Sequence, residues 1–136
     1  MPEGTYTLLM KLPATATVTV GALGEQSFPA GWYAYTGSAF GPGGFARVDR
    51  HHEVANGERD ARHWHIDYLL GDTPAEIRSV VRTPDRDVEC AVAAAIDGHP
   101  VVGGFGASNC DCGTHLVHSA DRATIVESAK AAHREH

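Results

Sequence analysis

The stretch TYTLLMKL, residues 5–12, decides the first element of the fold. Apolar or aromatic side chains recur at every second position: Tyr6, Leu8, Met10 and Leu12 share one face, whereas Thr5, Thr7 and Lys11 share the other. A period of two residues is typical of a β-strand that buries one face. The stretch therefore predicts a strand, which the pair Pro13-Ala14 interrupts.

Two more strands are predicted directly after the first. Residues 17–20 are rich in β-branched side chains, and residues 32–36, WYAYT, are rich in aromatic ones. The segment between them, residues 21–31, contains Gly24, Pro29 and Gly31 and favours turns. Three successive strands predict an antiparallel meander.

Helical spacing begins after the glycine-rich loop at residues 41–44. In residues 45–55 the expected inward stripe is Phe45, Val48, His52 and Ala55, before a stop at Asn56-Gly57. Arg47, Arg50 and His51 lie on another face at spacings that let them converge on one ligand.

The rest of the chain alternates between short helices and short strands. We expect a helix over 63–70 ended by Gly71, a strand over 76–82, a helix over 87–97, a loop over 103–106, a strand over 115–119, and a helix from the cap Asp121 to His133. This mixture predicts a single α/β (α+β) domain, residues 1–136, with a central antiparallel sheet of three or more strands flanked by helices.

The composition predicts a soluble cytoplasmic protein. The opening Met-Pro-Glu-Gly does not resemble a signal peptide, and the longest apolar run, residues 91–96, is too short to span a bilayer. The three cysteines, Cys90, Cys110 and Cys112, cannot all pair within the chain, which favours a reducing compartment.

The charge balance is acidic, with 17 Asp and Glu residues against 11 Lys and Arg residues. Proteins that bind nucleic acid usually carry a basic excess, so composition alone favours a protein that does not bind it. A salty, halophilic cytoplasm offers another explanation. There salt would screen long-range attraction to phosphate, and contacts would depend on a few close arginines.

Several ordered motifs resemble those of one nuclease superfamily. Gly4-Thr5-Tyr6 and Tyr35-Thr36-Gly37 each lie on an expected strand, Arg47-Val48-Asp49-Arg50-His51 opens a helix, and Glu89 lies on a later helix. These motifs resemble the GIY-YIG nucleases. Residues 63–70, HWHIDYLL, and 110–116, CDCGTHL, are similar to those of the small stand-alone Uri-type endonucleases, so that the resemblance covers nearly the whole chain.

The resemblance implies a metal-dependent endonuclease that hydrolyses phosphodiester bonds of nucleic acid, with DNA favoured over RNA. One divalent metal, Mg²⁺ or Mn²⁺, would be held by Glu89, and Arg47 would donate to the scissile phosphate. Tyr6 or Tyr35 would activate or orient the attacking water.

The other expected site residues would assist. His51 would help proton transfer or bind phosphate, since histidine titrates close to neutrality. The expected substrate-binding residues are Gly37, Ser38, Arg50 and His65. A phenol with a pKa near ~10 is a poor base, so the tyrosines require nearby cations to lower that pKa.

The chain also departs from the pattern of the superfamily. Thr5 and Thr36 stand where the tripeptides carry Ile, and the interval between the tripeptides is longer, with room for the extra strand at residues 17–20. This insertion either leaves the sheet intact or displaces Tyr6 from its expected position.

Two other functions are open on the sequence. The first is a non-catalytic module on the same fold that binds nucleic acid or protein. The second is a zinc hydrolase whose ligands would be Cys110, Cys112 and His115, with Cys90 as a fourth. Around the helix at residues 63–70 we interpret Trp64 as core, His63 as exposed, and Asp67 as orienting a neighbouring histidine.

Overall fold

The computed structural model describes residues 3–40, 44–60, 62, 64–101, 105 and 114–136. The strands of its main sheet are β1 (Gly4–Leu12), β4 (Gly31–Ser38), β5 (Glu76–Pro84), β6 (His99–Pro100) and β7 (Leu116–Ser119). Its helices are α1 (Ala46–Ala55), α2 (His65–Asp72), α3 (Glu89–Ala95) and α4 (Arg122–Glu135).

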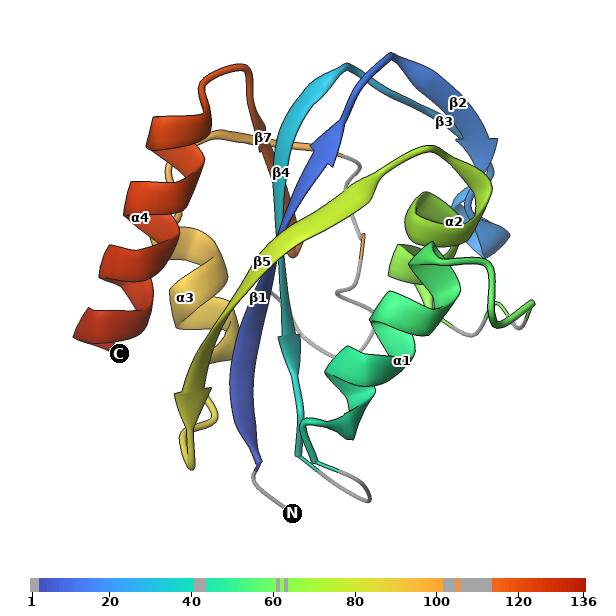
Figure 1. Ribbon diagram of the computed structural model, residues 1–136. Coiled ribbons are helices and arrows are strands. Elements are labelled where there is room, and N and C mark those ends of the chain that lie inside the picture. Colours follow the sequence, from blue (N-terminus) through green and yellow to red (C-terminus); the bar gives the residue numbers. More distant parts are fainter. Residues whose placement is uncertain (1–2, 41–43, 61, 63, 102–104, 106–113) are drawn as a thin grey trace.

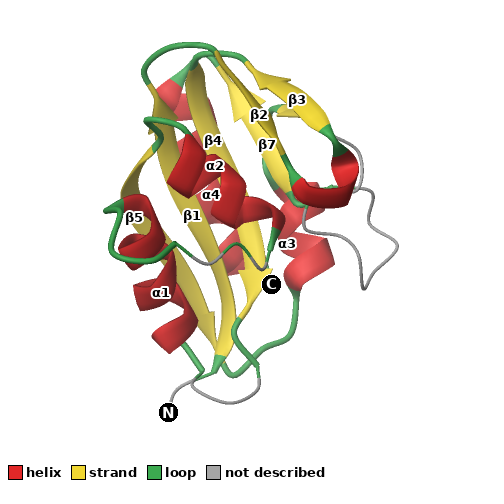
Figure 2. Ribbon diagram, turned by 90° about the vertical axis from the view of Figure 1, so that its right-hand side faces the viewer, coloured by secondary structure: helices red, strands yellow, loops and turns green. Residues whose placement is uncertain are grey.

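Helices cover both faces of this sheet. The strands run antiparallel in the order β5-β1-β4-β7-β6. Helices α1 and α2 lie on one face, and α3 and α4 lie on the other (Figure 1). Figure 2 views the sheet from the side of α1 and α2, which lie next to each other. The predicted α+β class with a central antiparallel sheet is confirmed.

The expected meander of three successive strands was wrong. β2 (Ala16–Thr19) and β3 (Glu25–Phe28) pair with each other in a separate two-stranded sheet, with a short 3₁₀ turn, Gly21–Leu23, between them. β3 lies in the segment that was expected to form turns. Its sequence does not alternate between apolar and polar residues, because only Phe28 of its four residues is apolar. The hairpin leaves the main sheet undisturbed, and β1 pairs directly with β4.

Strand β1 is buried on both faces. Tyr6, Leu8, Met10 and Leu12 pack in a core with residues of α1 and α2, whereas Leu9 packs in a second core with residues of α3 and α4. Thr5 and Thr7, expected on a polar face, are also fully buried. The central position of β1 in the sheet, between β4 and β5, explains this burial.

The inward face of α1 differs from the expected stripe. Its buried residues are Val48, His51 and Val54, whereas His52 is only partly buried. The helix is turned so that His51 reaches the sheet. α2 also continues through Gly71 to Asp72 instead of ending at the glycine.

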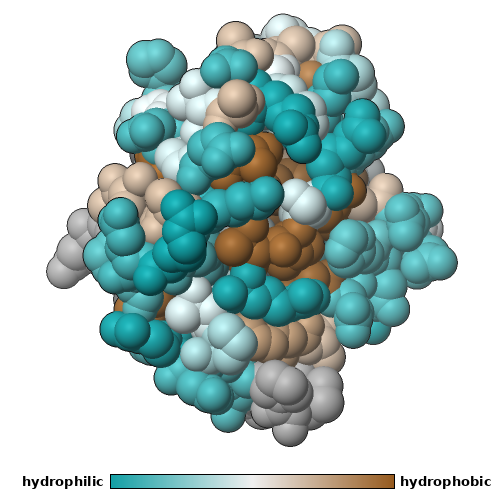
Figure 3. All heavy atoms as spheres, turned by 60° about the vertical axis from the view of Figure 1, so that its left-hand side comes forward, coloured by the Kyte–Doolittle hydropathy of each residue, from teal (hydrophilic) through white to brown (hydrophobic). Residues whose placement is uncertain are grey.

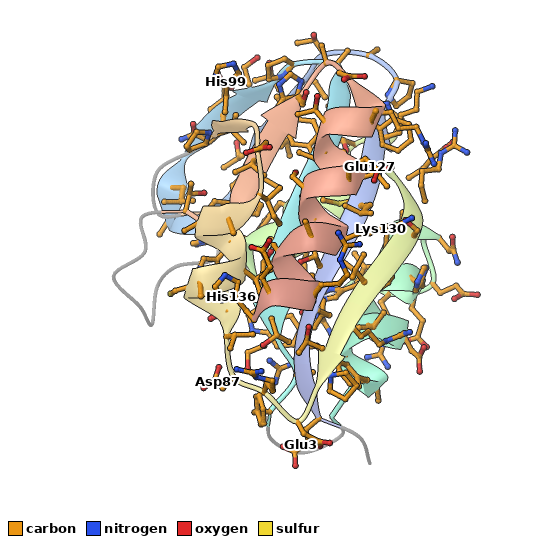
Figure 4. All side chains as sticks on the ribbon, turned by 90° about the vertical axis from the view of Figure 1, so that its left-hand side faces the viewer. Glu3, Asp87, His99, Glu127, Lys130 and His136 are labelled. Atoms are coloured by element: carbon orange, nitrogen blue, oxygen red, sulfur yellow. The ribbon has the colours of Figure 1, made fainter. Side chains whose placement is uncertain are left out.

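Helix α4 is amphipathic and begins at its expected cap. The Ala123 N–H donates to Asp121 Oδ1 over 3.3 Å. Glu127 and Lys130 lie on the outer face of the helix (Figure 4). Figure 3 shows the side of the molecule that carries α4, where hydrophilic side chains surround an apolar area. No helix in the described part of the chain combines the length and apolar character needed to cross a membrane.

Candidate functional site

The two tripeptides meet across strands β1 and β4. Tyr6 pairs with Gly37 in the strand register, and its Oη lies 2.7 Å from Nε2 of the buried His51. A Cβ added to Gly37 would lie 2.5 Å from Tyr6 Oη, and one added to Gly4 would lie 2.9 Å from the Cα of Pro84. Both glycines are therefore required by close approach, and despite the long interval between the tripeptides Tyr6 lies directly opposite Gly37.

Tyr35 lies on the same side of the sheet as Tyr6. Its ring is edge-on to His51, with centroids 6.3 Å apart, and edge-on to Phe105, with centroids 6.0 Å apart. The ring of His65 lies 5.6 Å from that of Phe105. Tyr35 therefore belongs to an aromatic wall, and His65 is one ring farther from the tyrosines.

Arg47 and Glu89 approach the backbone of the same residue, Ser38, at the end of β4. Arg47 Nη1 donates to the carbonyl oxygen of Ser38 over 2.6 Å. The backbone N–H of Ser38 donates to the Glu89 carboxylate. A helix from each layer thus contributes one charged side chain to one place, and these two predicted site residues are brought together. The Ser38 amide, expected to face a phosphate, is directed at Glu89.

Glu89 has an unusual acidity for a carboxylate. Burial and, to a smaller extent, the charge of Asp87 raise its pKa from 4.5 to about 7, against the opposing effects of Arg47 and the Ser38 N–H. Asp87 lies near the end of the molecule that also carries Glu3 (Figure 4). Near neutral pH both the acid and the carboxylate are therefore populated. Sequence analysis missed Asp87, although its position two residues before Glu89 was a usable signal.

The acidities of the tyrosines and of His51 differ from our expectation. Burial raises the pKa of Tyr6 and that of Tyr35 well above 10.0, and the opposing effect of Arg47 is smaller. Burial lowers the pKa of His51 from 6.5 to about 4. The expected near-neutral titration of His51 was wrong, because burial outweighs the nearby charges, and Arg47 alone does not lower the pKa of either phenol below 10.0.

A second group of side chains joins α1 to α2. Both terminal nitrogens of Arg50 donate to Asp67, over 2.9 and 3.0 Å, and Asp67 is fully buried. Asp67 also accepts the backbone N–H of Trp64 over 3.0 Å. Trp64 is 38% exposed, so its assignment to the core was wrong. Asp67 therefore binds Arg50 and ties α1 to α2, and the expected substrate-binding role of Arg50 stays a prediction.

The described part of the expected zinc set lies beside Glu89. Cys90 Sγ is 3.9 Å from His115 Nε2, and His115 Nδ1 is 3.6 Å from Glu89 Oε2. Cys110 and Cys112 lie outside the described residues, as does His63. Within the residues that the structure describes, no group of three or more His, Cys, Asp or Glu side chains is arranged to hold a metal ion. The zinc set therefore stays a prediction.

The match to a family covers nearly the whole chain. Residues 5–136 match the family model described as "Domain of unknown function DUF123". The chain belongs to the DUF123 family. No curated protein and no solved structure matches it. For this DUF123 chain, function must be argued from the site itself.

Proposed function

We propose that this DUF123 chain is a divalent-metal-dependent endonuclease that hydrolyses phosphodiester bonds of nucleic acid. One observation carries the proposal. Side chains from four separate elements gather at the end of β4: Tyr6 from β1, Tyr35 from β4, Arg47 from α1 and Glu89 from α3. A phenol, a guanidinium and a carboxylate are the groups that phosphodiester hydrolysis with one metal requires.

Glu89 is the residue that would hold Mg²⁺ or Mn²⁺. Its side chain is 24% exposed, which leaves the carboxylate accessible, and the effect of burial on its pKa is larger than the opposing effect of Arg47. These properties fit a hard cation that keeps several waters and takes one protein oxygen. The metal would serve as a Lewis acid at the phosphoryl group and would assist departure of the leaving oxygen.

Arg47 binds the phosphate. Ser38 O occupies one of its terminal nitrogens, and the guanidinium carries further N–H donors in a planar fork that suits phosphate oxygens. Hydrogen bonds to a phosphate in a partly buried site favour the pentacoordinate transition state, in which negative charge on the oxygens increases. The contact with Ser38 fixes the guanidinium at the end of β4.

Tyr6 and His51 handle the proton of the attacking water. In the tautomer of neutral His51 that carries its proton on Nδ1, the Tyr6 O–H donates to Nε2, so the phenol oxygen accepts a proton from water as its own proton passes to the imidazole. A bound phosphate raises the pKa of His51 through its negative charge, which makes the imidazole a better acceptor. Because the tyrosine only relays a proton, its raised pKa is no obstacle. Tyr35 forms a wall that limits access of water to the relay.

The test is a cleavage assay with purified protein and Mg²⁺ or Mn²⁺ on structured and unstructured DNA and RNA, at low and molar salt. We expect cleavage by the native chain and none by Arg47→Ala or Glu89→Ala. Matched controls are Arg134→Ala and Glu127→Ala, which remove exposed charges of α4 and should leave cleavage unchanged. If the native chain cuts none of these substrates, the proposal is wrong.

A binding module without turnover is a second candidate. The lowered pKa of His51, which would have to receive the proton, and the use of one Arg47 nitrogen by Ser38 favour it. It predicts salt-sensitive binding of nucleic acid and no product in the same assay.

A further inference from the structure

Trp64 is the one large apolar side chain that is exposed among the residues the structure describes, with 38% of its surface accessible. It stands immediately before α2, and its ring centroid lies 5.9 Å from that of His51. Exposure of a tryptophan costs hydrophobic free energy, and single exposed residues are common on protein surfaces. Trp64 differs from an ordinary exposed residue in that it lies next to the candidate catalytic residues.

The tryptophan is held rigidly. The guanidinium carbon of Arg50 lies 4.4 Å from the ring centroid, and that of Arg47 lies 5.0 Å from it. Arg50 is in turn fixed by both oxygens of buried Asp67, which also accepts the Trp64 N–H. Asp67 therefore fixes the Trp64 ring, through Arg50, and also the Trp64 backbone. A surface that is already ordered loses little conformational entropy when a planar ligand stacks on it.

Arg47 connects the tryptophan to the rest of the site. Its guanidinium lies over the Trp64 ring and also donates to Ser38 O, and Ser38 donates to Glu89. A phosphate bound by Arg47 would therefore place the neighbouring bases of the same strand within reach of Trp64. Aromatic rings combined with cations are the usual surface for unpaired bases.

We propose that Trp64 is a stacking surface for an unpaired nucleobase next to the scissile phosphate. The substrate class would then be nucleic acid with single-stranded or splayed nucleotides, since a base within an intact duplex has no free face to stack. This inference rests on the proposed nuclease function for the placement of the phosphate, but the stacking itself is measurable without cleavage.

The acidic charge of the chain gives stacking additional weight. At a net charge of -6 the protein repels a polyanion at long range, so affinity cannot come mainly from counterion release. Stacking depends little on salt and contributes affinity without a basic surface. Binding through Trp64 should therefore persist at salt concentrations that abolish purely ionic contacts.

The binding test uses fluorescence of the full chain with Trp32→Phe. The chain has two tryptophans, so this variant leaves Trp64 as the only one. In the presence of a chelator, a fluorescein-labelled oligothymidine should bind, seen as anisotropy, and the unlabelled strand should quench Trp64. The matched probe is an abasic strand of equal length, which keeps the phosphates and lacks the bases. We expect it to bind about 5- to 150-fold more weakly and to cause no quenching. Equal affinity for both strands, or binding without quenching, would overturn the stacking proposal.

The cleavage test compares Trp64→Ala with Trp64→Phe on single-stranded and duplex substrates. The alanine variant should lose about 5- to 150-fold in kcat/KM on single strands, and the phenylalanine variant should retain most of it. Full activity of Trp64→Ala refutes stacking and leaves the nuclease proposal standing. Quenching of Trp64 by the base-containing strand only, with no cleavage by the native chain, supports stacking and refutes the nuclease proposal.

Discussion

Three buried titratable groups make opposite contributions to stability at mildly acidic pH. His133 on α4 places Nε2 2.7 Å from Thr7 Oγ1 and Nδ1 2.7 Å from Thr83 Oγ1. Burial lowers the pKa of His133 from 6.5 to about 4, and that of His51 by the same amount. Burial raises the pKa of Glu89 from 4.5 to about 7. The free energy of unfolding should therefore depend on pH, and its slope against pH should decrease when a histidine is replaced and increase when Glu89 is replaced.

The sign follows from counting protons bound in each state. Each histidine binds a proton below 6.5 when unfolded and only near 4 when folded, so its stabilising contribution is complete above 6.5 and is lost as the pH falls. Glu89 stays protonated up to about 7 when folded and only to 4.5 when unfolded, so its contribution is lost as the pH rises. At pH ~5.5 the unfolded state binds about 0.9 proton more for each histidine and about 0.9 fewer for Glu89, a net slope of ~1.2 kcal/mol per pH unit.

Urea unfolding between pH ~5 and ~6, followed by circular dichroism, measures this slope. His133→Gln removes one histidine and should reduce the slope to about zero, whereas Glu89→Gln removes the opposing group and should raise it to ~2.4 kcal/mol per pH unit. Burial also lowers the pKa of His115, which adds the same amount to the slope of the native chain and of both variants. The differences between the slopes are therefore the quantity to compare. Equal slopes in the three proteins, or a steeper slope in His133→Gln than in Glu89→Gln, would refute the reasoning.

Three further perturbations test packing and charge. Gly37→Ala should move Tyr6 out of its place, cost about 1–3 kcal/mol in urea unfolding and abolish cleavage; a variant with native stability would show that the strands separate easily. Asp67→Ala leaves the Arg50 charge buried and should cost about 3–5 kcal/mol in the same assay, whereas a loss under ~1 kcal/mol would show that water replaces the carboxylate. Mn²⁺ affinity, measured by calorimetry, should fall as the pH drops below about 7 because protonated Glu89 binds no cation. An affinity that does not change between pH ~6 and ~8 would contradict the role of Glu89 as ligand.

Periodicity predicted the elements whose sequence alternates between apolar and polar side chains, and it failed where the inward side chains are polar. Residues 5–12 and the cap at Asp121 gave clear signals because alternation and capping are local properties. β3 gave none, since one of its two inward side chains, Gln26, is polar and only Phe28 is apolar. The choice between His51 and His52 as the inward residue of α1 depended on Tyr6, a partner 45 residues away in the sequence. No local pattern contains that partner.

For the site, motif order was informative and individual roles were not. The order of the motifs correctly indicated that Tyr6 and Gly37 lie together, as do Arg47 and Glu89. It did not indicate which cation the Asp67 carboxylate would bind, because side chains on two helices compete for it in space. The acidities were predicted wrongly for a related reason. Desolvation depends on the whole surrounding structure, and sequence analysis considered only the neighbouring charges.

The two positions at which the tripeptides depart from those of the superfamily that the sequence resembles also have a structural explanation. Thr5 and Thr36 face the layer that contains α3 and α4, where an isoleucine would meet polar neighbours. Thr36 Oγ1 lies 2.9 Å from Thr7 Oγ1, which in turn contacts His133. Each hydroxyl in this buried network has a partner, and a satisfied network makes the packing of α4 specific.

Thr5, on the same strand as Thr7, makes a separate set of polar contacts next to the site. Its hydroxyl donates to Arg86 O over 2.8 Å and accepts the N–H of Val88 over 3.1 Å, which fixes the segment immediately before α3. Glu89 is the first residue of that helix, so the departure at Thr5 helps to place the carboxylate at Ser38. Arg47 reaches the backbone of Ser38 from the opposite helical layer. The site therefore forms where the two helical layers meet at the end of one strand, and its geometry depends on the buried polar contacts behind the sheet as much as on the tripeptides in front of it.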